Sequence, residues 1–243
     1  MFQPIATQRL YQQVASRIED LIAGGKIGAG KRLPAEKELA RQLGVSRPTI
    51  REAMIALEIA GLVEVRTGSG IYVSKQVPSR TVIIDSGPGP FELLNARLLI
   101  EGEIAANVAV QALPEDLIEI RQTIDDMESA MASGGHGRDA DQAFHKRIAA
   151  VTNNSVLTGL VDTLWSNMFN PMFNKLSERT GLLRNQQETV RDHKAIFAAL
   201  STRDALGART AMRQHLLRVE SILSGAPVDA EQGVVSISRA PSK

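Results

Sequence analysis

Apolar residues recur every three or four positions through the first quarter of the chain, which is the spacing of amphipathic helices. The pattern predicts three short helices, each followed by a glycine that can end it: Gly24, Gly44 and Gly61. Ser46 is a good N-cap for the third helix, and Pro48 is tolerated there because the N–H groups of a first turn have no helical partner. The first domain therefore begins with three helices, and a tight turn joins the second to the third.

The spacing then changes to that of a β-hairpin. Val63 and Val65 alternate with polar residues in the first strand, and Ile71 and Val73 belong to the returning strand. The glycine-rich turn between them is residues 68–70. Three helices followed by a hairpin are typical of a winged helix-turn-helix, which places a helix N-terminus and a hairpin tip against a DNA duplex. We assign residues 1–75 to this DNA-binding domain.

The rest of the chain carries a different pattern. Residues 76–90 are rich in proline and glycine and predict a linker. Residues 91–224 show helical periodicity and no apparent strand, so we expect an all-α bundle. Residues 225–243 lack apolar periodicity and predict a disordered tail. The expected fold class is mainly α, with a winged helix-turn-helix followed by an all-α effector domain.

Composition disfavours a membrane or secreted protein, and the distribution of charge indicates a nucleic-acid partner. The chain has 243 residues, no cysteine and no apolar run that could cross a bilayer, and its N-terminus does not resemble a signal peptide. We therefore expect a cytoplasmic protein with no membrane partner. The formal net charge is only +1, but residues 26–51 hold seven basic side chains against two acidic ones. Such a patch is typical of nucleic-acid binding, and a solvated charged face is the alternative for charge alone.

The basic residues gather where a recognition helix would begin. Arg47, Thr49 and Arg51 lie at the start of the third predicted helix. Its N-terminus can therefore present guanidinium and hydroxyl groups to a major groove, where arginine paired with guanine is the commonest specific contact. The alternative, which this clustering disfavours, is a three-helix unit with a hairpin that binds nothing.

The first domain resembles the operator-binding domain of the GntR family of bacterial transcription regulators. The resemblance spans nearly all of residues 8–75 and is carried by the Leu-Pro-Ala-Glu run at 33–36, the Gly-Val-Ser-Arg turn at 44–47, the run at 49–53 and the wing at 68–70. It implies a double-stranded operator as partner. The implied DNA contacts are Arg32, Lys37, Ser46, Arg47, Thr49, Arg51, Thr67 and Gly68.

Histidines in the second domain indicate a metal site. The chain has four histidines, and only His136 lies in a glycine-rich loop. Asp141 and His145 are four residues apart and share a helix face, while His193 and His215 lie among core residues of two other predicted helices. One carboxylate and three imidazoles can hold a divalent metal ion of Zn, Ni or Mn type. For any single histidine, a partly buried structural side chain is the ordinary alternative.

This set is similar to the metal motif of the FadR branch of GntR regulators, whose helical effector domain, of FCD type, encloses a metal beside a ligand cavity. The resemblance implies that residues 91–224 form an antiparallel bundle that binds a ligand and forms the dimer, and that these four residues are the metal ligands. It also implies that Arg97, on the first helix of the bundle, points into the cavity and holds a carboxylate. The alternative for Arg97 is a surface ion pair with Glu101, which would contribute little.

The effector is suggested by two short segments. Residues 89–97 and 170–176 look most like the hexuronate regulators of the ExuR/UxuR kind. This resemblance implies a small carboxylate effector, namely a sugar acid such as a hexuronate. Asn167 and Asn170 are the candidates for recognising its hydroxyl groups.

Together these predictions describe a regulator rather than an enzyme. We expect a repressor that binds a palindromic operator as a homodimer and releases it when the effector enters the metal-bearing cavity. Two alternatives stay open. A metalloenzyme fused to a DNA-binding domain would use the metal to activate water, although the chain has no His-Glu-x-x-His helix. A constitutive DNA-binding dimer would use the metal only to stabilise its fold.

Overall fold

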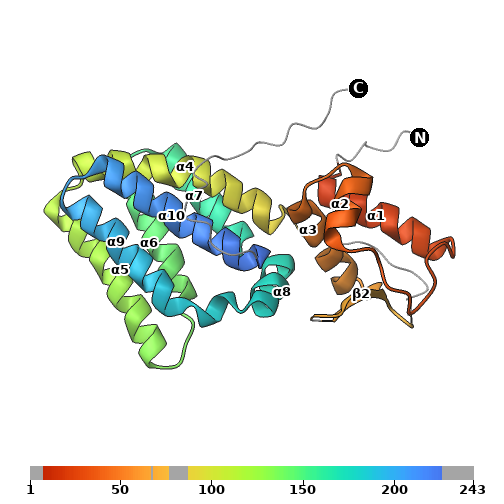
Figure 1. Cartoon of the computed structure of the whole chain (residues 1–243). Coiled ribbons are helices and arrows are strands. Elements are labelled where there is room, and N and C mark those ends of the chain that lie inside the picture. The colour runs from red at the N-terminus through yellow and green to blue at the C-terminus, as the bar shows by residue number, and fades with distance from the viewer. Residues whose placement is uncertain (1–7, 67, 77–86, 226–243) are drawn as a thin grey trace, which may run out of the picture. The chain divides into compact units, whose positions relative to one another are not determined.

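The computed structural model of the protein describes residues 8–66, 68–76 and 87–225 (Figure 1). These residues divide into two compact units, of which the first ends at Pro90 and the second begins at Phe91. Most of the predicted linker lies outside the described residues, as does all but the first residue of the predicted tail.

Three helices and a hairpin make up the first unit, which confirms the predicted winged helix-turn-helix. The elements are α1 (Leu10–Ala23), α2 (Glu36–Leu43), α3 (Arg47–Ile59), β1 (Val63–Arg66) and β2 (Gly70–Val73). Helix α3 packs against both α1 and α2. The side chains of Ile50, Met54 and Leu57 on α3 are fully buried, so the helical spacing read from the sequence is the spacing of this core.

The turn between α2 and α3 fixes where α3 begins. Gly44 adopts a left-handed conformation, with φ of +66°, and ends α2. The Ser46 hydroxyl then accepts a hydrogen bond from the Thr49 backbone N–H at 3.2 Å, which confirms Ser46 as the N-cap of α3. Local contacts therefore help to fix the direction of the α3 N-terminus.

The hairpin is antiparallel, with Val63 opposite Val73. The chain just before α2 extends it, because the Leu33 N–H donates to the Ile71 carbonyl oxygen at 2.8 Å. Arg32 lies against the second strand, since a Cβ atom added at Gly70 would come within 2.7 Å of its Nε atom. The hairpin, which is the wing of this domain, is thus joined by hydrogen bonds to the segment that leads into α2.

The second unit is an all-α bundle, and no strand occurs in its described residues. Its helices are α4 (Pro90–Gln111), α5 (Pro114–Ala132), α6 (Arg138–Val151), α7 (Ser155–Asn167), α8 (Pro171–Thr180), a short 3-10 turn (Leu182–Arg184), α9 (Gln186–Ser201) and α10 (Ala205–Ser224). Long helices run side by side (Figure 1): α5 contacts both α6 and α9, and α10 packs against α9. The expected mainly α fold class is confirmed.

The structure contains a short helix, α8, that the apolar pattern of the sequence did not reveal. Its boundaries are set by polar and backbone signals: Asn170 caps its N-terminus, Pro171 occupies the first turn, and Gly181 ends it with φ of +68°. None of the helices in the described part of the chain combines the length and apolar character that a membrane span needs.

Candidate functional site

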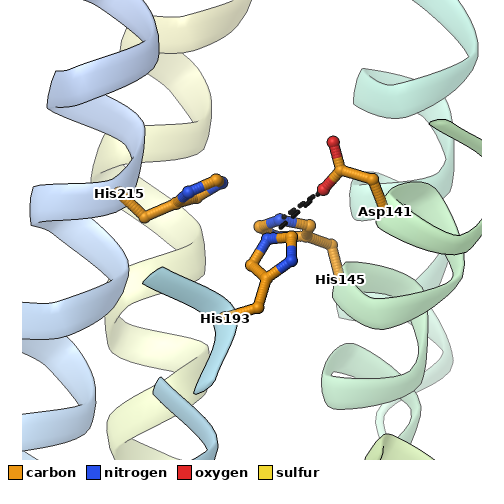
Figure 2. Close-up of side chains that lie close together, drawn as sticks. All are labelled: Asp141, His145, His193 and His215. Carbon is orange, nitrogen blue, oxygen red and sulfur yellow. Dashed lines mark ion pairs between the residues drawn. The ribbon is translucent and has the colours of Figure 1, made fainter. Parts of the chain in front are cut away.

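The four predicted metal ligands meet inside the bundle. Asp141 and His145 project from α6, His193 from α9 and His215 from α10, and the four side chains point toward one another (Figure 2). Their candidate ligand atoms all lie within 4.8 Å of one another. The Asp141 Oδ1 atom lies 3.3 Å from His193 Nε2 and 3.5 Å from His145 Nε2. Residues as far as 74 positions apart in the sequence are thereby brought into one cluster.

The chemistry of this cluster fits a divalent cation. Asp141 Oδ1, His145 Nε2 and His193 Nε2 are buried and have no hydrogen-bond partner among the described residues. Buried polar atoms are rarely left without a partner, so three such atoms facing one point require an explanation. A cation of Zn, Ni or Mn type accepts both carboxylate oxygen and imidazole nitrogen. Asp141, His145, His193 and His215 are the side chains that would hold it.

The pKa shifts of three of the four side chains favour a bound cation, whereas the pKa of His145, which burial would lower, is raised by Glu101 and Asp141. Burial lowers the pKa of His193 well below its usual value and also lowers the pKa of His215. Burial would raise the pKa of Asp141, but contacts with His145 and His193 hold it well below its usual range. At neutral pH Asp141 is therefore a carboxylate, and His193 and His215 are uncharged rings with a lone pair available to a metal.

Carboxylates outside the cluster lie beside two of the histidine rings. His145 Nδ1 lies 2.5 Å from Glu101 Oε2, and His215 Nδ1 lies 3.5 Å from Asp192 Oδ2. Metal-bound histidines usually present their other ring nitrogen to such a group, which fixes the tautomer and the ring direction. The sequence analysis did not identify either carboxylate as a partner of a histidine, because each partner lies on a different helix.

Arg97 lies beside the cluster and is buried, with 2% of its surface exposed. Its Nε atom lies 2.6 Å from Glu101 Oε1, and its guanidinium lies over the Trp165 ring at 4.1 Å from the centroid. The surface-pair alternative is therefore wrong: the pair with Glu101 exists, but it is a core pair. Burial would raise the pKa of Glu101, yet Arg97 and His145 lower it to about 2.

A cavity opens next to Arg97 and the cluster, and both Asp141 and His215 belong to its wall. Trp165 and several methionine, phenylalanine and leucine side chains supply apolar surface. The sequence analysis did not identify the other polar groups of the wall, which are His136, Arg138, Gln186 and Thr189. This combination of apolar surface and a few polar groups is typical of small-molecule sites.

Two predicted effector residues do not line this cavity. The Asn170 Oδ1 atom accepts a hydrogen bond from the Phe173 N–H at 2.8 Å, so its side chain serves as the N-cap of α8. The Asn167 amide donates to the Thr163 carbonyl oxygen at 2.8 Å within α7. Both side-chain amides therefore hydrogen-bond to the backbone of a helix. Residue type alone could not distinguish this role from recognition of an effector hydroxyl group.

The first unit presents several of the predicted DNA contacts at its surface. Arg32, Lys37 and Arg47 are exposed, and none of them forms an ion pair with a described residue. Gly68 is exposed at the hairpin turn, with φ of +73°, and Thr67 lies outside the described residues. The basic patch therefore contains cations that are free to meet phosphates.

The other predicted contacts also have structural roles. The Arg51 Nη2 atom lies 2.6 Å from Glu36 Oε2, and this half-buried ion pair joins α3 to α2. The Ser46 and Thr49 hydroxyls lie 2.8 Å apart at the N-cap of α3. Substitution of these three residues would therefore alter the position of α3 as well as any contact with DNA.

Each of the two units matches a known protein family. The sequence pattern of bacterial regulatory proteins, gntR family, matches residues 10–73, and that of the FCD domain matches residues 92–218. The chain is 42% identical over 226 residues to the Uxu operon transcriptional regulator of Escherichia coli K12, covering 90% of this chain and 88% of that protein. It is 37% identical over 224 residues to the Exu regulon transcriptional regulator of the same strain, covering 89% and 85%.

Solved structures agree on the fold. The structure of E. coli McbR/YncC matches 90% of this chain and 99% of its own chain, with a TM-score of 0.50 and 23% identity. The sequence-based expectations of a GntR domain, a helical effector domain and a regulator rather than an enzyme are thus confirmed. The chain belongs to the gntR family of bacterial regulatory proteins and is a DNA-binding transcriptional regulator with an FCD domain.

Proposed function

We propose that the protein is a ligand-responsive repressor that acts in the cytoplasm on a palindromic operator. It binds the operator as a homodimer, carries one divalent metal ion in each FCD domain, and releases DNA when a small carboxylate occupies the cavity. The effector class is a sugar acid such as a hexuronate.

One observation carries this proposal. The wall of a single cavity includes two members of the candidate metal cluster and the guanidinium groups of Arg97 and Arg138. Metal ions and guanidinium groups both favour oxygen-rich anions, and a sugar acid offers carboxylate and hydroxyl oxygens together. The relatives named as regulators of the Uxu operon and the Exu regulon support a hexuronate, in agreement with the sequence resemblance.

Exposed apolar side chains support the homodimer. On α4, Leu99 and Val110 are exposed to 52% and 61%, and on α7 Val156 is exposed to 75%. We propose that these side chains belong to the interface between two copies, since contiguous exposed apolar surface commonly marks a protein–protein contact. A dimer with two-fold symmetry matches a palindromic operator, whose half-sites must have the spacing of the two recognition helices.

The test is an operator titration with and without effector. The operator is first selected from a random DNA library with the metal-loaded protein, and its affinity is then measured by fluorescence anisotropy. We expect a hexuronate to weaken operator binding by about 5- to 150-fold, because that is the usual size of a coupling between two sites. A second candidate function, constitutive DNA binding with a structural metal, requires that no sugar acid changes the affinity.

A further expectation concerns the recognition helix. Replacing Arg47 by alanine should weaken specific operator binding by about 1–3 kcal/mol and relax the sequence preference, because this exposed guanidinium lies at the N-terminus of α3. Replacing Lys37 by alanine should weaken all DNA sequences alike and reduce the salt dependence by about one unit. Unchanged operator affinity of the Arg47→Ala protein at physiological salt would contradict this placement.

A further inference from the structure

The cavity wall contains a second arginine, Arg138, in addition to Arg97. Arg138 is the first residue of α6, one turn before the metal-ligand candidate Asp141 on the same helix. The two arginines differ in their partners. Arg97 is paired with Glu101, whereas Arg138 has no carboxylate within ion-pair distance among the described residues.

Arg138 is nevertheless held in a defined position. Its Nη1 atom donates a hydrogen bond to Asn174 Oδ1 at 2.9 Å. Its guanidinium lies over the rings of Phe169 and Phe173, at 4.9 Å and 5.4 Å from their centroids. Both rings also line the cavity. A guanidinium fixed by an amide and two aromatic rings is already ordered, so an anion that binds it loses little entropy in positioning it.

The charge of Arg138 is also incompletely compensated. The side chain is about half-buried, and burial lowers its pKa by more than the charges of Asp141 and Asp139 raise it, because the charged form has lost part of its hydration. Arginine stays protonated in proteins, so this loss is recovered only through an anionic partner. An effector carboxylate would supply that partner with two parallel hydrogen bonds.

Arg97 is less suited to the same task. Glu101 occupies its Nε and Nη2 atoms at 2.6 Å and 3.4 Å, and Trp165 covers one face of its guanidinium. A carboxylate that approached Arg97 would also approach the carboxylate of Glu101. The pair as a whole is neutral, so it attracts an anion much less than an unpaired arginine does.

We propose that Arg138, rather than Arg97, binds the carboxylate of the effector, and that the hydroxyl or carbonyl oxygens at the other end of the molecule face the metal cluster. This assignment rests on the proposed function and defines how the effector is oriented in the cavity, with its carboxylate at Arg138 and its other oxygens at the cluster. Trp165 Nε1 is a buried donor with no hydrogen-bond partner among the described residues, and Trp165 lines the cavity beside Arg97. It is the donor available to an uncharged oxygen of the effector.

The direction also defines the ligand class. Arg138 and Asp141 are separated by three residues, which corresponds to a rise of about 4.5 Å along α6. The Arg138 guanidinium and the cluster are separate groups of one cavity wall, so an acid that contacts both needs a carboxylate and a further oxygen at different ends of the molecule. A uronic acid has this layout, with a carboxylate at one end of the carbon chain and a carbonyl or hydroxyl group at the other.

The test compares each acid with its neutral isostere. Trp165 is the only tryptophan of the chain, so its emission reports ligand binding in the cavity. Metal-loaded full-length protein is titrated with glucuronate, galacturonate and their two keto isomers, and with the corresponding amides. The wild-type protein should bind at least one acid 10-fold or more tightly than its amide. In the Arg138→Gln protein that preference should disappear, while affinity for the amide and metal content stay the same.

Two further variants complete the experiment. Arg138→Lys keeps the charge but not the paired geometry, and should retain part of the preference for the acid. Arg121→Gln removes an exposed arginine of α5 that pairs with Asp125, and should behave as wild type. A preference for the acid that survives in Arg138→Gln would overturn the assignment and place the carboxylate at the metal. If no acid binds the wild-type protein, the effector class itself is wrong and this assignment fails with it.

Discussion

Replacing His193 by alanine is expected to remove the metal ion and to destabilise the FCD domain strongly. His193 is fully buried, and its Nε2 atom faces Asp141 Oδ1 at 3.3 Å, so the substitution removes one candidate ligand from inside the cluster. A ligand present at a thousand times its dissociation constant adds about 4.1 kcal/mol to the free energy of unfolding. The variant should lose a stabilisation of this order. Elemental analysis and urea unfolding measure the two effects.

The matched control is His136→Ala, because His136 is exposed and lies outside the cluster. It should retain about one divalent ion per chain. Treatment of the wild-type protein with a chelator provides a second measurement that does not depend on a substitution in the core, and it should lower the midpoint of unfolding reversibly. Equal metal content in the His193→Ala and wild-type proteins would exclude the proposed site.

Replacing Arg97 by alanine is expected to destabilise the protein by about 3–5 kcal/mol, the usual cost of leaving a buried ion without its partner. The partner is Glu101, whose side chain is only 3% exposed and lies 2.6 Å from the Arg97 guanidinium. Without Arg97, Glu101 either keeps an uncompensated charge or takes up a proton. Either change also disturbs His145, which shares the same carboxylate. Urea unfolding of the metal-loaded protein measures the effect.

Arg209→Ala is the control, since Arg209 also pairs with a glutamate of α4. Its Nη2 atom lies 2.7 Å from Glu103 Oε2, but both side chains are exposed. Loss of this ion pair should therefore change the free energy of unfolding little. The double variant Arg97→Ala/Glu101→Gln should recover part of the lost stability, because no buried carboxylate is left unpaired and the glutamine amide oxygen can still accept a hydrogen bond from His145 Nδ1. A stability loss for Arg97→Ala no larger than that for Arg209→Ala would show that the pair is not a core element.

The sequence alone determined the winged helix-turn-helix, because its signals are local. The spacing of apolar residues, the N-cap at Ser46 and the glycine turns at Gly44 and at the hairpin each act within a few residues. Each signal favours the same helices and strands, so local preference and tertiary packing agree. The pairing of Asp141 with His145 is local in the same sense, since four residues place both side chains on one helix face.

Only the tertiary structure decided which side chains from different helices share a surface. Whether Arg97 and Glu101 lie inside or outside the bundle depends on the face of α4 that its neighbours cover, and spacing within one helix does not define that face. The same holds for Arg138, which became a cavity residue because α8 brings Phe173 and Asn174 against the start of α6. Helical periodicity reports which residues share a face, but the packing of the helices determines which faces meet, and the cavity forms where they meet.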